Sequence, residues 1–194
     1  MPGEATTASA RRTELLEAAY RYALAHGLAD LSLRPLAAAI GSSPRVLMFL
    51  FGNKDGLVRA LLARARADEL AILDGLRRAG RGAPVGLAPA VERIWAWLAV
   101  EEHRPLLRLW AEAYARSLVE PGGAWAGFAR ATVDDWLGAL ADCQPPPERD
   151  GEDGATRRTL ALAVLRGALL DLLATDDERR TTAAVRQQLA LLHG

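Results

Sequence analysis

Side chains that could carry out catalysis are few in this chain of 194 residues, and their spacing is not that of a catalytic or metal-binding site. The chain has three histidines, which lie far apart in the sequence: His26, His103 and His193. None has another histidine or a cysteine at the spacing of a metal site. The single cysteine, Cys143, cannot form a disulfide within the chain, and neighbouring carboxylates such as Glu101 and Glu102 diverge on a helix. The sequence therefore predicts no catalytic residues, no metal and no cofactor.

Residues 30–57 instead contain hydroxyl and cationic side chains that suit the phosphates and base edges of DNA. Ser32 precedes an apolar run, so we expect its hydroxyl to cap a helix and, with the following amides, to bind a phosphate. Arg45 could pair bidentately with a guanine edge. The candidate DNA contacts are Ser32, Arg34, Ser43, Pro44, Arg45, Val46, Met48, Phe49 and Lys54. The ordinary alternative is that the serines only cap helices and that the cations are solvated.

Two short helices must position these side chains. The apolar run that begins at Leu33 ends at Gly41, a residue type that readily takes the left-handed conformation of a helix C-terminus. Ser43 then caps a second segment whose first residue is Pro44, and Gly52 ends that segment after about two turns. Two capped helices around a three-residue turn predict a helix-turn-helix, whose second helix enters the major groove of DNA. The same pattern also fits two ordinary short helices of an all-α protein.

Longer helices are expected on both sides of this pair. Residues 11–25 repeat apolar side chains at helical spacing, and a long helical run follows Asn53. Through the order and spacing of the segments LLEAAYRYALAHG, LSLRPLAAAIGSS and PRVLMFLFGNKDGLVRALL, the sequence resembles the tetracycline-repressor (TetR) family of bacterial transcription regulators over residues 11–62. The resemblance implies an all-α fold, with an N-terminal three-helix DNA-binding head and a C-terminal helical bundle for ligand binding and dimerisation. It also implies that Lys54 faces the DNA backbone.

The predicted recognition helix, the second of the short pair, is unusually apolar. The resemblance implies that Leu47 and Phe51 face inward, and the side chains between them are apolar where relatives usually carry polar or hydroxyl-bearing aromatic ones. Pro44, Val46 and Phe49 could contact thymine methyl groups, so we expect weak or apolar readout of the bases. The alternative is that this apolar cluster is partly buried within the protein.

The composition fits a helical cytoplasmic protein. Apolar residues make up 51% of the chain, strand-like alternation is not sustained anywhere, and the net charge is zero. No run approaches the ~20 apolar residues of a membrane span, and the polar N-terminus lacks the apolar core of a signal peptide. Residues 1–66 hold nine basic and five acidic side chains, whereas residues 67–194 hold fifteen and nineteen. The basic excess therefore lies in the predicted DNA-binding head, as contact with phosphates requires.

All five tryptophans lie between residues 95 and 136, within or next to predicted helices. Trp95 and Trp97 are two residues apart and cannot share a helix face, whereas Trp110 and Tyr114 can. The resemblance implies an effector pocket in this region, and we expect a small hydrophobic or aromatic molecule to bind there. The candidate ligand-binding residues are Trp95, Leu98, Trp110, Tyr114, Trp125, Phe128 and Trp136. The plain alternative is that these aromatic side chains form the hydrophobic core.

The last two predicted helices, residues 157–174 and 177–192, differ from the others. The first is apolar around most of its circumference, so more than one neighbour must cover it. A second subunit is the expected cover, and the resemblance implies a four-helix bundle formed by two copies around a two-fold axis. The candidate interface residues are Leu162, Leu165, Leu169, Leu172, Val185 and Leu189. A central helix of a monomeric bundle is the alternative.

The sequence thus predicts a disordered arm over residues 1–10, a helix-turn-helix DNA-binding domain over residues 11–54, and a ligand-binding and dimerisation domain over residues 55–194. The predicted function is that of a homodimeric, ligand-responsive transcriptional regulator, most often a repressor in this family, which binds a double-stranded DNA operator and a small effector. The alternative is a module that binds a hydrophobic small molecule or a protein and has weak or no specific DNA binding. A steep loss of DNA affinity with added salt distinguishes the two.

Overall fold

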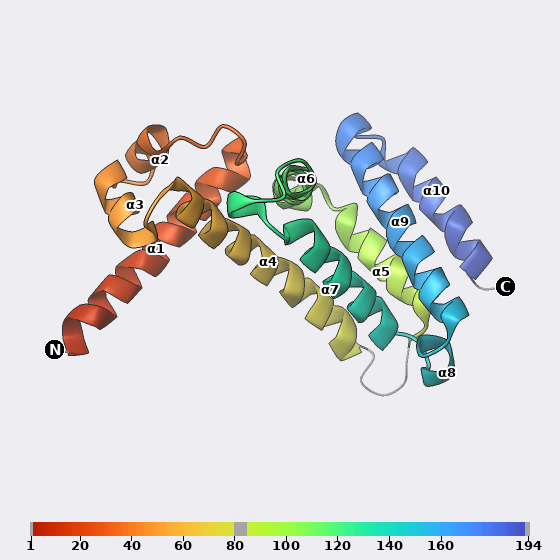
Figure 1. The fold of residues 1–194 in the computed structure, drawn as a ribbon. Helices are drawn as coiled ribbons and strands as arrows, with labels where there is room; N and C mark the ends of the chain where they lie inside the picture. The colour runs from red at the N-terminus through yellow and green to blue at the C-terminus, as the bar shows by residue number, and fades with distance from the viewer. Residues whose placement is uncertain (1, 80–84, 193–194) are drawn as a thin grey trace. The chain divides into compact units, whose positions relative to one another are not determined.

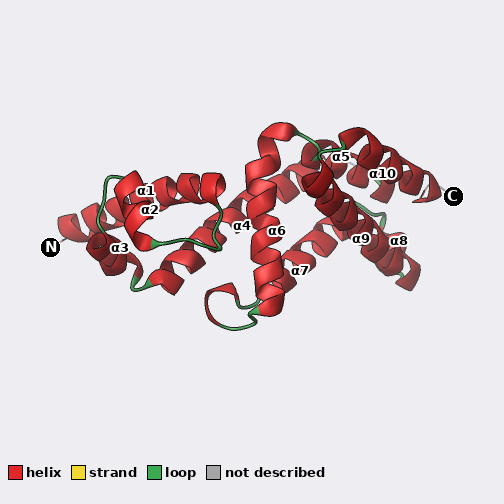
Figure 2. Cartoon of the chain, turned by 90° about the horizontal axis from the view of Figure 1, so that it is seen from above, coloured by secondary structure: helices red, strands yellow, loops and turns green. Residues whose placement is uncertain are grey.

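The computed structural model describes residues 2–79 and 85–192, and within these ranges the chain forms helices and loops without a strand (Figure 1, Figure 2). The predicted all-α fold is therefore confirmed. The helices of the described residues are α1 (Pro2–His26), α2 (Leu33–Ala39), α3 (Pro44–Phe51), α4 (Lys54–Ala79), α5 (Leu87–Leu98), η1 (Glu101–His103), α6 (Arg104–Val119), η2 (Gly123–Trp125), α7 (Phe128–Asp142), α8 (Pro146–Arg149), α9 (Glu152–Thr175) and α10 (Glu178–Leu192). None of the helices described is both long enough and apolar enough to cross a membrane.

These helices form two compact units. The first unit comprises Met1–Ala67 and Arg108–Ala129, and the second comprises Asp68–Leu107 and Arg130–Gly194. Helices α4, α6 and α7 each contribute residues to both units. We expected a domain boundary after residue 54, which is the first residue of α4. The first part of this helix, up to Ala67, belongs instead to the first unit, because its apolar face packs in that unit.

In the first unit, α1 buries one apolar stripe. Among the apolar side chains that recur at helical spacing within residues 11–25, Leu15, Ala19 and Ala23 are buried, whereas Ala18 and Tyr22 are half-buried. The three buried residues are four apart, so they lie one above another on a single face. This stripe provides the surface against which the short helices pack.

Helix α1 begins earlier than the sequence indicated. A disordered arm was expected over residues 1–10, but the structure is helical from Pro2 onward. A proline costs little in the first turn, where its missing N–H has no partner to lose. Further along the helix, the Thr13 hydroxyl donates to the Ser9 carbonyl at 3.1 Å, and Arg11 pairs with Glu14 at 2.7 Å, so both contacts support the part of α1 that precedes its buried stripe.

A short turn joins α2 to α3 (Figure 1), and its backbone and cap contacts are those predicted. Gly41 adopts a φ of +63°, which side chains with a Cβ rarely take, and the next residue, Ser42, donates its N–H to the Ala37 carbonyl at 2.8 Å. The Ser43 hydroxyl accepts a hydrogen bond from the Val46 N–H at 3.2 Å, and a proline follows it at the first helical position. These features stop α2 and start α3 in a new direction, as a helix-turn-helix requires.

The connection from α3 to α4 is equally specific. The Asn53 side-chain oxygen accepts the Gly56 N–H at 2.7 Å, which caps the start of α4. A Cβ atom on Gly56 would lie 1.9 Å from the backbone carbonyl oxygen of Phe51. Only glycine fits at this position while the end of α3 stays where it is.

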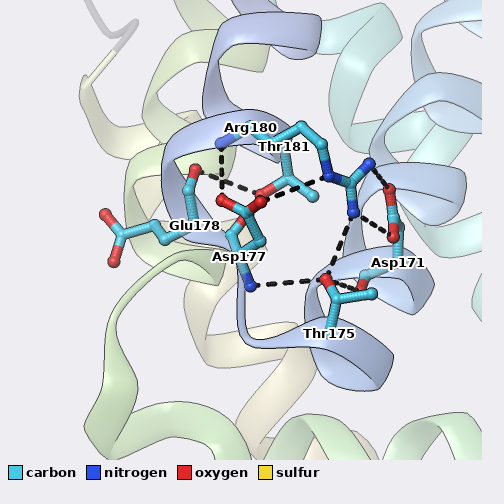
Figure 3. Close-up of polar contacts among 6 residues, drawn as sticks. All are labelled: Asp171, Thr175, Asp177, Glu178, Arg180 and Thr181. Carbon is cyan, nitrogen blue, oxygen red and sulfur yellow. Dashed lines mark hydrogen bonds and ion pairs between the residues drawn. The ribbon is translucent and has the colours of Figure 1, made fainter.

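In the second unit, α9 and α10 form a helical hairpin and lie side by side (Figure 1, Figure 2). Figure 3 shows the polar contacts at the turn that joins them. The Arg180 guanidinium donates to both carboxylate oxygens of Asp171, at 2.6 and 2.7 Å, and to the Thr175 hydroxyl at 3.2 Å. Its hydrogen bond to Asp171 lowers the pKa of that carboxyl group below the usual value, so the pair stays charged at neutral pH. The bidentate geometry fixes the turn.

We predict opposite effects of two glycine-to-alanine substitutions in α4. Gly56→Ala places a Cβ against the Phe51 carbonyl and should lower the free energy of unfolding by about 1–3 kcal/mol or more. Gly75→Ala, the matched control in the same helix, has no atom within 4 Å of its Cβ and should raise it by about 0.5–1 kcal/mol. Urea denaturation followed by circular dichroism at one protein concentration compares them. A Gly56→Ala variant as stable as Gly75→Ala would contradict the described α3–α4 connection.

Candidate nucleic-acid interface

Helix α3 is held by two buried side chains. Leu47 and Phe51 are 1% and 8% exposed, and their spacing of four residues puts them on one face of the helix. Arg12 of α1 supports the end of α3, because its Nε donates to the Leu50 carbonyl at 3.4 Å and its guanidinium lies 5.0 Å from the centre of the Phe51 ring. A cation at the C-terminus of a helix also interacts favourably with the helix dipole. The helix is therefore fixed in rotation about its own axis.

This anchoring leaves the opposite face of α3 in solvent. Phe49 is two residues from both Leu47 and Phe51, which at about 100° per residue puts it on the far side of the helix. Its side chain is 84% exposed, and Val46 and Met48 beside it are exposed as well. The alternative that this apolar cluster is buried does not hold within the described chain.

The predicted phosphate contacts are in positions that a ligand can reach. The side chains of Ser32, Arg34, Ser43, Arg45 and Lys54 are all accessible to solvent, and Pro44 is half-buried. Ser43 makes its predicted cap, but Ser32, although it occupies the N-cap position of α2, makes no side-chain cap bond. Pro35, the third residue of the helix, has no N–H, so it removes one of the two backbone donors that an N-cap serine hydroxyl uses. The prediction that Ser32 caps with its hydroxyl was wrong.

The candidate ligand residues of the body are distributed over both compact units. Trp110, Tyr114, Trp125 and Phe128 belong to the first unit, and Trp95, Leu98 and Trp136 belong to the second. Most of them are buried or half-buried, so the structure does not gather them into one exposed cluster. As predicted, Trp95 and Trp97 diverge: the first is buried, and the second is half-buried and stacks on His103 with ring centres 4.0 Å apart.

Three of these tryptophans use their indole N–H within the chain. Trp95 donates to the Thr182 hydroxyl at 3.0 Å, Trp110 to the Ala65 carbonyl at 3.4 Å, and Trp136 to the Glu69 carboxylate. A buried indole N–H is costly unless it has such a partner. These three rings are therefore fixed in orientation, each within the unit to which it belongs.

Two acidic contacts, one buried and one half-buried, were missed by sequence reasoning. Glu69 is buried beside Trp136, and Glu112 of α6 accepts a hydrogen bond at 2.9 Å from the Leu28 N–H, directly after α1. The sequence did indicate that Glu69 faces inward. It lies between Ala65 and Leu73 in a stripe of buried α4 positions that recur every four residues. The partners themselves are 67 and 84 residues away in the sequence, where periodicity gives no information.

The candidate interface residues of the last two helices lie mostly inside one chain. Five are buried without any partner chain, namely Leu162, Leu165, Leu172, Val185 and Leu189, and Leu169 is half-buried. Helix α9, which contains the four of these leucines between residues 162 and 172, packs against α5 and against α10, which contains Val185 and Leu189. Its other apolar side chains include Leu160 and Leu170, which are 47% and 57% exposed.

The first unit matches a known family of DNA-binding regions. The family model described as bacterial regulatory proteins of the tetR family matches residues 15–61, a range that includes α2, α3 and the turn between them. Residues 15–61 of the chain are thus those of a TetR-family DNA-binding region. Among the described residues, no group of three His, Cys, Asp or Glu side chains could hold a metal ion.

Solved structures of other proteins share the fold over nearly the whole chain. A transcriptional regulator from Rhodococcus sp. Rha1 has a TM-score of 0.72 at 22% identity, with 93% of this chain and 95% of that chain covered. Salmonella enterica GusR has a TM-score of 0.68 at 20% identity, with 94% and 95% covered. The multidrug binding protein EbrR complexed with imidazole has a TM-score of 0.65 at 25% identity, with 91% and 88% covered. Structures of EbrR complexed with proflavin and with ethidium also match. No curated protein matches the sequence.

Proposed function

We propose that this TetR-family protein is a homodimeric repressor whose affinity for operator DNA is set by a small hydrophobic or aromatic effector. The observation that carries the proposal is the exposed face of α3, held outward by the buried Leu47 and Phe51. In a helix-turn-helix the second helix lies in the major groove, and its exposed face meets the base edges. Exposed serine and cationic side chains at and near the ends of α2, α3 and α4 suit the phosphates on either side.

Phosphate contact is assigned to Ser32, Arg34, Ser43 and Lys54. The Ser32 hydroxyl makes no cap bond to its own helix, which leaves its donor and acceptor available to a phosphate oxygen. Arg34 and Lys54 are solvent-accessible cations at the starts of α2 and α4. These contacts orient the protein on the duplex but carry no sequence information.

The effector is assigned to the aromatic residues of the body. Sites lined by aromatic rings of fixed orientation favour planar ligands. Structures of EbrR, which has a similar fold, contain the planar dyes proflavin and ethidium. These two dyes are the first probes to titrate, with tryptophan fluorescence as the readout. An effector changes DNA affinity only by binding two arrangements of the protein with different affinities. The Glu112–Leu28 hydrogen bond supports such coupling, since it connects α6 to the segment that follows α1.

We assign dimerisation to the exposed face of α9. This face differs from the one predicted from the sequence, which included Leu162 and Leu165. Accessible apolar or small residues recur on α9 at spacings of three and four, which places them on one stripe: Leu160, Ala163, Gly167, Leu170 and Ala174. This spacing is that of a helix seam between two helices. The small residues in the middle of the stripe allow two helices to approach closely. A second copy of the chain buries the stripe, and two copies present two recognition helices to two half-sites.

The second candidate function is a module of the same fold with little operator affinity. The apolar exposed face of α3 and the zero net charge of the chain favour it. DNA binding with no salt dependence, or no DNA binding at all, would select this alternative.

We predict that two cations of the head contribute directly to salt-dependent DNA binding. Lys54→Ala and Arg34→Ala should each reduce the slope of log affinity against log salt by about 1, because each removes one phosphate contact. Arg130→Ala, which removes an exposed cation from α7, should leave the slope unchanged. Fluorescence anisotropy with a duplex selected from a random library measures all three. Equal slopes for the three variants would contradict the assigned phosphate contacts.

We predict that Leu170→Lys dissociates the dimer. A charge at this position would be buried between two copies of α9 without a partner, which is unfavourable. Static light scattering at micromolar concentration should give twice the chain mass for the wild type and for the control Leu118→Lys, a similarly exposed leucine on α6. It should give the single-chain mass for Leu170→Lys. A wild-type protein that is monomeric, or a Leu170→Lys dimer, would contradict this part of the proposal.

A further inference from the structure

The exposed face of α3 has an unusual chemistry for a surface that meets DNA. Of the eight residues of the helix, Pro44–Phe51, only Arg45 is charged, and all the others are apolar. The side chain furthest from the anchoring residues is Phe49, which is 84% exposed. Val46 and Met48 stand on either side of it and are also exposed. The centre of this face can therefore offer apolar contact but almost no hydrogen bonds to a base edge.

The major groove contains one kind of apolar group on its base edges, the C5 methyl group of thymine. Burial of exposed apolar area is favourable in proportion to the area removed from water. Contact with these methyl groups therefore stabilises an exposed phenylalanine more than contact with the polar edges of guanine, cytosine or adenine. The surroundings suit a polyanion, because Arg34, Arg45 and Lys54 are accessible near the ends of the short helices.

We propose that α3 reads its operator mainly through thymine methyl groups, with Phe49, Val46 and Met48 as the specificity-determining residues and Arg45 as the single reader of guanine. This inference rests on the proposed function, since it assigns the chemistry by which the proposed DNA-binding face discriminates between sequences. The preferred ligand is therefore a DNA duplex whose half-sites contain thymines next to a guanine. Hydrogen-bond donors and acceptors of adenine–thymine pairs contribute little to this readout.

The test replaces thymine by uracil in the bound duplex. A duplex selected from a random library with the full-length protein is resynthesised with deoxyuridine in place of thymidine, first throughout each half-site and then position by position. Uracil keeps every hydrogen-bonding group of thymine in both grooves and lacks only the methyl group. Wild-type affinity should fall about fourfold for each thymine methyl group that is removed from the interface. Phe49→Ala should bind the thymine duplex more weakly and lose part of the discrimination against uracil.

Two controls keep the outcomes distinct. Leu118→Ala removes a comparably exposed apolar side chain from α6 and should retain the full discrimination, and circular dichroism should show Phe49→Ala to be folded. If wild-type protein binds both duplexes equally, with normal salt dependence, thymine-methyl readout is overturned while the proposed function stands. Failure to select any duplex would overturn the proposed function itself. A change in oligomeric mass in Phe49→Ala, without a change in discrimination, would assign Phe49 to a protein contact and also overturn the inference.

Discussion

The burial of Leu47 and Phe51 is the interaction on which the orientation of the recognition helix depends. A helix of eight residues has little stability of its own, so its orientation comes from the side chains it buries. With these two side chains inside the first unit, Phe49 and its neighbours must point outward. The Ser43 cap and the Gly41 turn determine where the helix begins, and Arg12 contacts its end. The direction in which the exposed face of α3 points is thus a consequence of the burial of two positions of one short helix that are four residues apart.

The body of the protein uses polar groups to fix aromatic ones. Trp95, Trp110 and Trp136 each direct the indole N–H to a partner on another helix, and these bonds define the orientation of the rings more closely than packing alone. A buried indole N–H without a partner would be unfavourable, so each of these bonds supports the packing of its own ring.

Local signals in the sequence were sufficient for the head. The Ser43 cap, the Gly41 turn and the inward positions of α3 depend on residues close together in the chain, and the structure contains all of them. The Ser32 cap failed for an equally local reason, the proline at the third position of α2. The helix-turn-helix was therefore predictable to the residue, apart from that one bond and the early start of α1.

Contacts between segments that are distant in the sequence could not be predicted. Helix α9 is apolar on nearly every side, so its sequence does not tell which stripe contacts its own chain and which a second copy; the structure shows that Leu162, Leu165 and Leu172 are used internally. The partners of Glu69 and Glu112 likewise come from distant segments. Such choices depend on how whole helices pack against one another, which periodicity within a single helix does not specify.

The most direct test of the central claim, that the face of α3 opposite Leu47 and Phe51 lies against the bases of DNA, uses the methionines. The chain contains two, Met1 and Met48, so protein labelled with carbon-13 at the methionine methyl groups gives two easily assigned NMR signals. With a bound duplex, the account predicts that the Met48 methyl signal shifts and shows nuclear Overhauser contacts to thymine methyl protons in the major groove. A Met48 signal that is unchanged in a sample saturated with DNA would contradict it.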